Sequence, residues 1–530
     1  MMLDVIVRGG AVFDGSGAPP GVRDVGVADG RIAALGDLSH TDAARVLGAE
    51  GLAVAPGFID VHTHSEYTLF AHPGADSAVR QGVTTHVAGN CGYSCAPIVR
   101  ADLAKHLIFG FEPAVGLAWE SLGDYFAALE RTGVAINVAC FAGHGSVRAA
   151  AMGLESRPAS DREIGRMQDL LAEALDEGAI GMSTGLAYPP GTNADRRELT
   201  ALCDVVARHG GLHATHVRNR DVRYEEGFGE VLELTERTGV SLQISHIVTK
   251  HGAPREATHH ALEMVERARH RGLDVACDML ICEWGPGQLT SFLRPEAFEG
   301  GMAATLDRLR DPGLRARLRH AEPSWRMALE PDQYHRMILS RAPRTPELVG
   351  KSLAELTADS GKDFHETACD ILVAHGEALY DVFMMGAAFD RGDTLAALTS
   401  AHCMPESDDV VAAPYGVLAR AALTPGCYGW APQFLAEMVR ERRLLAAEEA
   451  VRRLTSLPAE RFGLQRRGRL AEGYWADVVV CDLGRVASNS TLTDFARFPS
   501  GIEHVLVNGA LVVEHGQHTG ARPGQVLRRP

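Results

Sequence analysis

The sequence has little of what marks secreted, membrane-bound or nucleic-acid-binding proteins. Its 530 residues contain 10 cysteines and no Cys-x-x-Cys pair, so we expect no disulfide scaffold and predict a reducing, cytoplasmic location. The first residues, Met1–Arg8, lack the basic start and apolar run of a signal peptide. No apolar run approaches the roughly 20 residues that span a bilayer. The net charge of −16 disfavours nucleic acid or an anionic membrane as a partner.

What is present is an ordinary globular composition, 46% apolar. Eight apolar runs predict strands: Gly57–His64, Val83–Cys91, Ala135–Gly143, Gly178–Thr184, Gly211–Val217, Ser241–Ile247, Leu273–Ile281 and Cys403–Asp408. Helical patterns such as Asp161–Glu177 and Arg196–His209 lie between most of them. Strands that alternate with helices indicate a parallel sheet. Eight of them predict an α/β fold with a TIM-like (β/α)8 barrel over residues 56–464.

The two ends of the chain differ from the middle. Residues 1–55 and 465–530 resemble short strands separated by glycine turns. We expect both ends to form one small β-sandwich domain. A ninth strand-like run, Val382–Ala388, lies with an Arg- and Pro-rich stretch in an insertion at about residues 295–400, after the seventh barrel strand.

Histidines stand at the ends of three predicted strands. The first strand leads into His62-Thr63-His64. Residues two apart in a strand point to the same face, so both imidazoles can reach one metal ion, for which Zn, Fe, Ni and Mn are candidates. His216 and His246 end the fifth and sixth strands, at the edge that forms the active-site face of a barrel. His213 faces the other way and is interpreted as structural.

A cysteine and an aspartate complete the constellation. Cys91 ends the second strand and offers a thiolate ligand. Asp408 follows the eighth strand, where a carboxylate can bind metal and act as general base and acid, although Glu406 and Asp409 compete for this role. A metal lowers the pKa of its bound water toward about 7, and the aspartate can pass that water's proton to a leaving nitrogen. The residues therefore predict hydrolysis of an amide or a related C–N bond.

Short motifs then occur in order along the chain: Pro56–His64, Gly89–Gly92, Gly143–Arg148, Gly178–Leu186, Thr215–Asn219, Ile244–His246, Gly350–Leu356 and Gly468–Asp477. On these motifs the chain resembles the amidohydrolase superfamily and, within it, the D-aminoacylase (N-acyl-D-amino-acid deacylase) group, over nearly its whole length. The resemblance implies a barrel with a β domain from both termini, and a zinc-dependent hydrolase of a small-molecule N-acyl-D-amino acid or a related N-acylated compound.

The resemblance also implies roles for particular residues. A tight Zn2+ site would lie on Cys91, His216 and His246. A second, weaker site would lie near His62, His64 and Asp408, and Asp408 would be the catalytic residue.

The substrate end departs from the family pattern. Members have His-Pro-Arg where this chain has Arg420–Gly429, and that arginine is thought to grip the substrate carboxylate. Arg420 lies three residues before the expected register, and Lys250 lies four residues beyond His246. These two residues, with His144, are the candidate substrate-binding residues. The missing His-Pro-Arg therefore suggests a substrate whose carboxylate is masked or absent, such as a peptide, an acylated amine or a natural-product intermediate.

Two other functions stay open. One is hydrolysis of a cyclic amide or ureide, as in hydantoinases and dihydroorotases, although these have a lysine where this chain has Cys91. The other is a metal-binding pseudoenzyme on the same scaffold, which the altered carboxylate clamp suggests. Ring-opening assays distinguish the first, and binding without turnover distinguishes the second.

Overall fold

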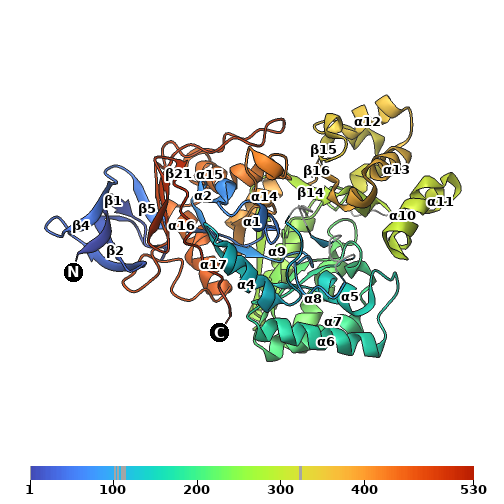
Figure 1. Cartoon of the computed structure of the whole chain (residues 1–530), viewed down its shortest axis with the longest axis horizontal. Helices are drawn as coiled ribbons and strands as arrows, with labels where there is room; N and C mark the ends of the chain where they lie inside the picture. The colour runs from blue at the N-terminus through green and yellow to red at the C-terminus, as the bar shows by residue number, and fades with distance from the viewer. Residues whose placement is uncertain (1, 101–102, 104–106, 109–114, 321–324, 530) are drawn as a thin grey trace.

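The structure is a computed structural model that describes residues 2–529, except 101–102, 104–106, 109–114 and 321–324. At one side of the molecule, Figure 1 shows strands from the start of the chain, such as β5 (Ala53–Pro56), beside β21 (Gln517–His518) from near its end. At the opposite side lie four helices: α10 (Gly301–Arg310), α11 (Pro312–Arg317), α12 (Leu353–Ser360) and α13 (Phe364–His375). No helix in the described part of the chain combines the length and the hydrophobicity that crossing a lipid bilayer requires.

The middle of the chain forms parallel strands in two hydrogen-bonded groups. The first group has the order β6 (Phe58–Asp60), β7 (Val83–Ala88) and β8 (Asn137–Cys140). The second has the order β9 (Ala142–Gly143), β10 (Gly181–Gly185), β11 (Leu212–His216), β12 (Ser241–Ile244), β13 (Val275–Leu280) and β17 (Cys403–Glu406). Each of the eight predicted runs overlaps an observed strand. The third run is split at Phe141 into β8 and β9.

Backbone contacts join the first and the last of these strands. The Asp408 N–H donates to the His62 carbonyl at 3.1 Å, and the His64 N–H donates to the Asp409 carbonyl at 2.8 Å. Thr63 and Asp409 form a parallel bridge. The ends of β6 and β17 therefore lie together, although nearly 350 residues separate them in the sequence.

Helices pack around the parallel strands. The larger ones are α4 (Leu122–Thr132), α5 (His144–Met152), α6 (Asp161–Asp176), α7 (Arg196–Arg208), α8 (Tyr224–Thr238), α9 (Ala257–His270), α14 (Arg391–Thr399) and α16 (Ala447–Leu454). The shorter ones are α1 (Thr68–Ala71), α2 (Asp76–Val79), α15 (Trp430–Leu435) and α17 (Ser456–Arg461). Helix α6 shows why they form: Ser160 and Glu163 make a capping box at its start. Its apolar residues at helical spacing, Ile164, Met167 and Leu171, are buried.

Both chain ends contribute strands to one sheet. These strands are β1 (Leu3–Val12), β2 (Gly21–Ala28), β3 (Arg31–Gly36), β4 (Ala43–Gly48), β5 (Ala53–Pro56), β18 (Val478–Cys481), β19 (Ile502–Val507), β20 (Ala510–Glu514) and β21 (Gln517–His518). A sandwich has two separate sheets, whereas these nine strands form one continuous sheet. The reason lies in β1, whose register shifts between Val7 and Gly10. Its first half pairs with β4 and its second half with β5.

A separate antiparallel sheet follows β13. It has the order β14 (Trp284–Gln288), β16 (Phe383–Ala387) and β15 (Met337–Arg341). With it lie α10 (Gly301–Arg310), α11 (Pro312–Arg317), α12 (Leu353–Ser360) and α13 (Phe364–His375). This unit, residues 284–387, has its own apolar core around Leu339, Leu372 and Met384. It begins about ten residues before the predicted insertion, because Trp284–Gln288 pairs with β16 along its whole length.

Candidate metal centre

All six predicted ligands lie at the C-terminal ends of the parallel strands. They are His62 and His64 after β6, Cys91 after β7, His216 at the end of β11, His246 after β12 and Asp408 after β17. None of these residues is more than 8% exposed. Because their strands are neighbours in a parallel array, residues far apart in the sequence meet at one edge.

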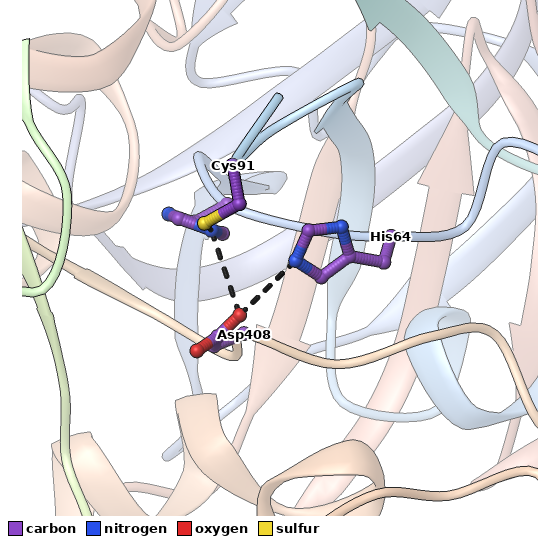
Figure 2. A group of neighbouring side chains, drawn as sticks. His64, Cys91 and Asp408 are labelled. Carbon is purple, nitrogen blue, oxygen red and sulfur yellow. Dashed lines mark hydrogen bonds and ion pairs between the residues drawn. The ribbon is translucent and has the colours of Figure 1, made fainter. Parts of the chain in front are cut away.

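Four of them form one group of potential ligand atoms. Figure 2 shows the side chains of His64, Cys91 and Asp408 pointing toward one another. The Asp408 Oδ1 atom lies 3.2 Å from His64 Nε2 and 3.5 Å from His62 Nε2. The Cys91 Sγ atom lies 3.2 Å from His62 Nε2.

A second group shares the cysteine. The Cys91 Sγ atom lies 3.5 Å from His246 Nε2 and 3.9 Å from His216 Nδ1. Ligand atoms of a tetrahedral zinc site, with bonds of about 2.0–2.3 Å, lie roughly 3.5 Å apart. The donor set of thiolate, imidazoles and carboxylate and these separations both fit zinc. Cys91 is the ligand common to the two groups.

A buried carboxylate behind the ligands orients two of them. The Asp278 Oδ1 atom accepts the His246 backbone N–H at 2.8 Å and lies 3.4 Å from His62 Nδ1. Carboxylates in this position fix the orientation of a metal-binding imidazole. A role for Asp278 in the site was not predicted from the sequence. The available signal was an acidic residue inside the buried apolar strand Val275–Leu280.

Three ligand residues have left-handed backbone conformations. Their φ angles are +55° at Cys91, +38° at His246 and +48° at Asp408. A non-glycine residue in such a conformation costs on the order of 1–3 kcal/mol and persists where surrounding contacts over-determine it. The Asp408 N–H bond to His62 and the His246 N–H bond to Asp278 are two such contacts. Local strain is therefore concentrated at the candidate metal ligands.

Burial and charge set the protonation of these groups. Burial, and then Arg220, hold the pKa values of His216 and His246 well below the ordinary histidine value. Both rings are therefore neutral and can ligate. Burial alone would raise the pKa of the Cys91 thiol, but the facing His62 lowers it below its ordinary value. Burial would likewise raise the pKa of Asp408, which His62 and His64 lower.

The acids that compete with Asp408 occupy different environments. Asp409 turns away from the ligands and accepts backbone N–H groups of Val410, Leu423 and Thr424 at 2.8–3.0 Å. Glu406 is fully buried, and burial raises the pKa of its carboxyl well above the ordinary value. Among the three, Asp408 alone lines the cavity above the ligands.

The three candidate substrate-binding residues lie in three different places in the structure. Lys250 lines the cavity above the metal ligands, with its Nζ atom 4.9 Å from the centre of the Trp325 ring. Arg420 is exposed and lines a different surface groove, where its carbonyl accepts a hydrogen bond from Arg341 at 2.8 Å. His144 is buried outside the cavity and bonds to Glu198 at 2.7 Å. The structure therefore brings only Lys250 to the site.

A cation that the sequence analysis missed lines the same cavity. Arg220 is 5% exposed and lies over the Phe389 ring, with Cζ 5.6 Å from the ring centre. Its Nη1 donates to the carbonyls of His246 and Val248, whereas its Nε has no hydrogen-bond partner. No carboxylate of the described residues forms an ion pair with it. The sequence feature that could have indicated Arg220 is its position, four residues beyond the strand-terminal His216.

The network around His144 is structural and yields a stability prediction. The Glu198 carboxylate bonds to both His144 and Arg148, and none of the three is exposed. We expect Arg148→Met to lower the free energy of unfolding by about 3–5 kcal/mol, because it leaves a buried carboxylate without its main partner. Arg157→Met removes a comparable pair with Glu163, but at the surface, and is expected to change stability by about 1 kcal/mol or less. Urea unfolding measures both, and equal effects would contradict the prediction.

Comparison with known proteins assigns the fold and site to one family. The model of the amidohydrolase family matches residues 45–326 and 414–513. N-acyl-D-glutamate deacylase of Alcaligenes xylosoxydans xylosoxydans is 36% identical over 529 residues, which are 99% of this chain and 97% of that protein. D-aminoacylase of the same organism is 34% identical over 530 residues, covering 99% and 98%.

A solved structure agrees with these matches. N-acyl-D-glutamate deacylase of Bordetella bronchiseptica, complexed with zinc and a phosphonate inhibitor, superposes with a TM-score of 0.83. It is 33% identical and covers 100% of both chains. The chain therefore belongs to the amidohydrolase family, and within it to the group of D-aminoacylases and N-acyl-D-amino-acid deacylases.

Proposed function

We propose that this chain is a zinc-dependent hydrolase that cleaves the amide bond of an N-acyl-D-amino acid. The observation that carries the proposal is the convergence of six ligand-type side chains under a cavity that two buried basic side chains also line. The similar proteins named D-aminoacylase and N-acyl-D-glutamate deacylase support this substrate class.

The architecture belongs to the same proposal. The eight parallel strands, with the contacts between the ends of β6 and β17, form a (β/α)8 barrel. Residues 1–55 and 465–530 form the β domain of both termini. The insertion sits at the C-terminal edge of the strands, where it supplies Gln288, Trp325 and Phe383 to the cavity.

The metal ligands divide into two sites in this proposal. Cys91, His216 and His246 hold one tight Zn2+, since two neutral imidazoles and a thiolate suit this ion. His62, His64 and Asp408, with the shared Cys91, hold a second ion more weakly. When bound, zinc acts as a Lewis acid on the scissile carbonyl and makes a hydroxide available at neutral pH.

Asp408 transfers a proton from the attacking water to the leaving nitrogen. Its carboxylate is ionised at neutral pH, because His62 and His64 hold its pKa below the ordinary value. It accepts a proton from the attacking water and donates it to the leaving nitrogen, which makes it general base and then general acid. His64, at 3.2 Å from Oδ1, holds the carboxylate in place.

Arg220 and Lys250 recognise a free carboxylate on the substrate. Both basic side chains are buried beside aromatic rings in the cavity. Burial, and then Arg220, hold the pKa of the Lys250 amine well below its ordinary value, so Arg220 supplies the main positive charge. An anion in such a place gains charge-assisted hydrogen bonds that water does not weaken. The charge on Arg220 stands in this chain for the one that Arg420 does not bring to the site, and it favours a free acid over a masked one.

Arg220→Met tests this role. We expect KM for the N-acyl-D-amino acid to rise about 10–100-fold, since a hydrogen bond to a charged group is worth about 1.5–3 kcal/mol. KM for the corresponding carboxamide should change little, and bound zinc should stay the same. Arg420→Met is the matched control and should behave as the wild type. Equal losses on the acid and the carboxamide would assign Arg220 a purely structural role.

A substrate panel tests the proposed function itself. The zinc-loaded enzyme is assayed on N-acetyl-D-amino acids, their L forms, their carboxamides and a hydantoin. D-selective release of the free amino acid supports the proposal. Turnover of the hydantoin alone would assign the chain to cyclic ureides, and bound zinc without any turnover would indicate a pseudoenzyme or a different substrate.

A further inference from the structure

A second cavity adjoins the metal cavity, and we call it the apolar chamber. Its lining includes Leu107, Leu154, Pro189, Pro190, Phe298 and Tyr380. No charged side chain is among the described residues that line it. Tyr93 and Gln288 line both cavities, so these two side chains separate the metal cavity from the chamber.

The wall between the cavities is a hydrogen-bonded pair. The Tyr93 hydroxyl donates to Gln288 Oε1 at 3.1 Å, and Gln288 Nε2 donates to the Tyr380 carbonyl at 3.0 Å. The Tyr93 ring also contacts the His64 ring, with centroids 6.0 Å apart, and stacks on Tyr188. The chamber therefore begins directly beside a metal ligand. A change in the rotamer of Gln288, which is half-buried, would break both of these hydrogen bonds.

The chamber and the buried basic side chains lie on opposite sides of the site. Tyr93 follows the second barrel strand, whereas Arg220 and Lys250 follow the fifth and the sixth. In an eight-stranded barrel the second and sixth strands face each other across the axis. A substrate whose carboxylate contacts Arg220 and whose amide lies at Cys91 and Asp408 can direct its acyl group toward Tyr93.

We propose that the apolar chamber binds the acyl chain, and that the preferred substrates are N-acyl-D-amino acids with apolar acyl groups longer than acetyl. The proposal rests on the deacylase function proposed above. It also gives the insertion a role, because Gln288, Pro295, Phe298 and Tyr380 belong to it. Leu154 and Asn193 at the chamber are half-buried, so its far end lies near the surface.

The test is an acyl-length series on one D-amino acid, from acetyl through butyryl and hexanoyl to octanoyl. We expect kcat/KM to rise with each added methylene, by up to about fourfold for those that enter the chamber. Leu154→Trp and Asn193→Trp, which fill the chamber from two sides, should reduce the octanoyl-to-acetyl ratio of kcat/KM by about tenfold or more. Leu314→Trp, a leucine of the same insertion on α11 and outside both cavities, is the control and should keep the wild-type ratio.

The outcomes separate this inference from the proposed function. If kcat/KM for acyl chains longer than acetyl equals or falls below the value for acetyl, the proposed role of the chamber is wrong, while the proposed deacylase function still stands. A rate that depends on the length of the amino-acid side chain, and not on the acyl chain, would also overturn it. Calorimetry with the free acids decides the case without turnover. Octanoate binding that is tighter than acetate binding, with the difference lost in Leu154→Trp, supports the chamber, and equal affinities overturn it.

Discussion

Replacing Cys91 with alanine is expected to remove the tightly bound zinc and the deacylase activity together. The thiolate is the ligand common to both groups, at 3.2 Å from His62 Nε2 and 3.5 Å from His246 Nε2. Loss of a residue that only supports a ligand lowers metal affinity about 10–100-fold, so loss of the ligand itself should lower it by at least roughly 100-fold. We expect kcat/KM to fall roughly 10³-fold or more, since groups that act as a unit fail together. Elemental analysis after dialysis and turnover at saturating zinc measure the two effects.

Cys95→Ala is the matched control. Cys95 is also buried, but it belongs to neither group of ligands. Burial raises the pKa of its thiol well above the ordinary value, so it stays protonated. The Cys95 variant should therefore keep its zinc and its activity. Normal zinc content in Cys91→Ala would exclude Cys91 from the metal ligands.

The convergence of the candidate metal ligands could be predicted because strand ends can be identified in the sequence. Apolar runs ending in His64, Cys91, His216 and His246 mark the carboxyl ends of parallel strands, which meet at one edge. Convergence then follows from topology and needs no knowledge of the loops. The family motifs added the choice of Asp408 over its acidic neighbours.

The substrate side could not be predicted in the same way. Beyond a strand end, the alternation of side chains stops, and a loop residue points where its long-range contacts direct it. Arg220 reaches the cavity because its guanidinium bonds to carbonyls of the loop after β12. Arg420, closer to the family register, follows a short helical turn at Gly416–Leu418 that keeps it at the surface.

The start of the insertion and the continuity of the terminal sheet could not be predicted from the sequence either, because both depend on long-range contacts. Trp284–Gln288 contains two glycines and a proline, which are poor strand formers, yet it is a strand because β16 pairs with it. Similarly, strands at both ends of the chain were predicted, but the continuity of their sheet depends on the shift in β1 between Val7 and Gly10. Pairing partners hundreds of residues away decide both features.

Asp408→Asn should separate metal binding from proton transfer. The substitution keeps the size of the side chain, and Cys91, His216 and His246 remain to hold the tight zinc. The amide cannot accept the water's proton, so we expect kcat to fall about 10²–10⁴-fold, the usual contribution of a general acid–base group. KM should change far less, since the cavity and its basic side chains are intact. Zinc content, kcat and KM on the same preparation measure the split.

Asp409→Asn is the control that tests the choice of carboxylate. The Asp409 Oδ2 atom accepts both the backbone N–H and the hydroxyl of Thr424, at 2.8 and 2.9 Å. An amide nitrogen in that place would face a donor, so this variant should lose stability while keeping kcat within about tenfold of the wild type. The opposite pattern, with normal kcat in Asp408→Asn and a large loss in Asp409→Asn, would move the proton-transfer role to Asp409. Because only Asp408 lines the cavity and contacts His64, the structure predicts the first pattern.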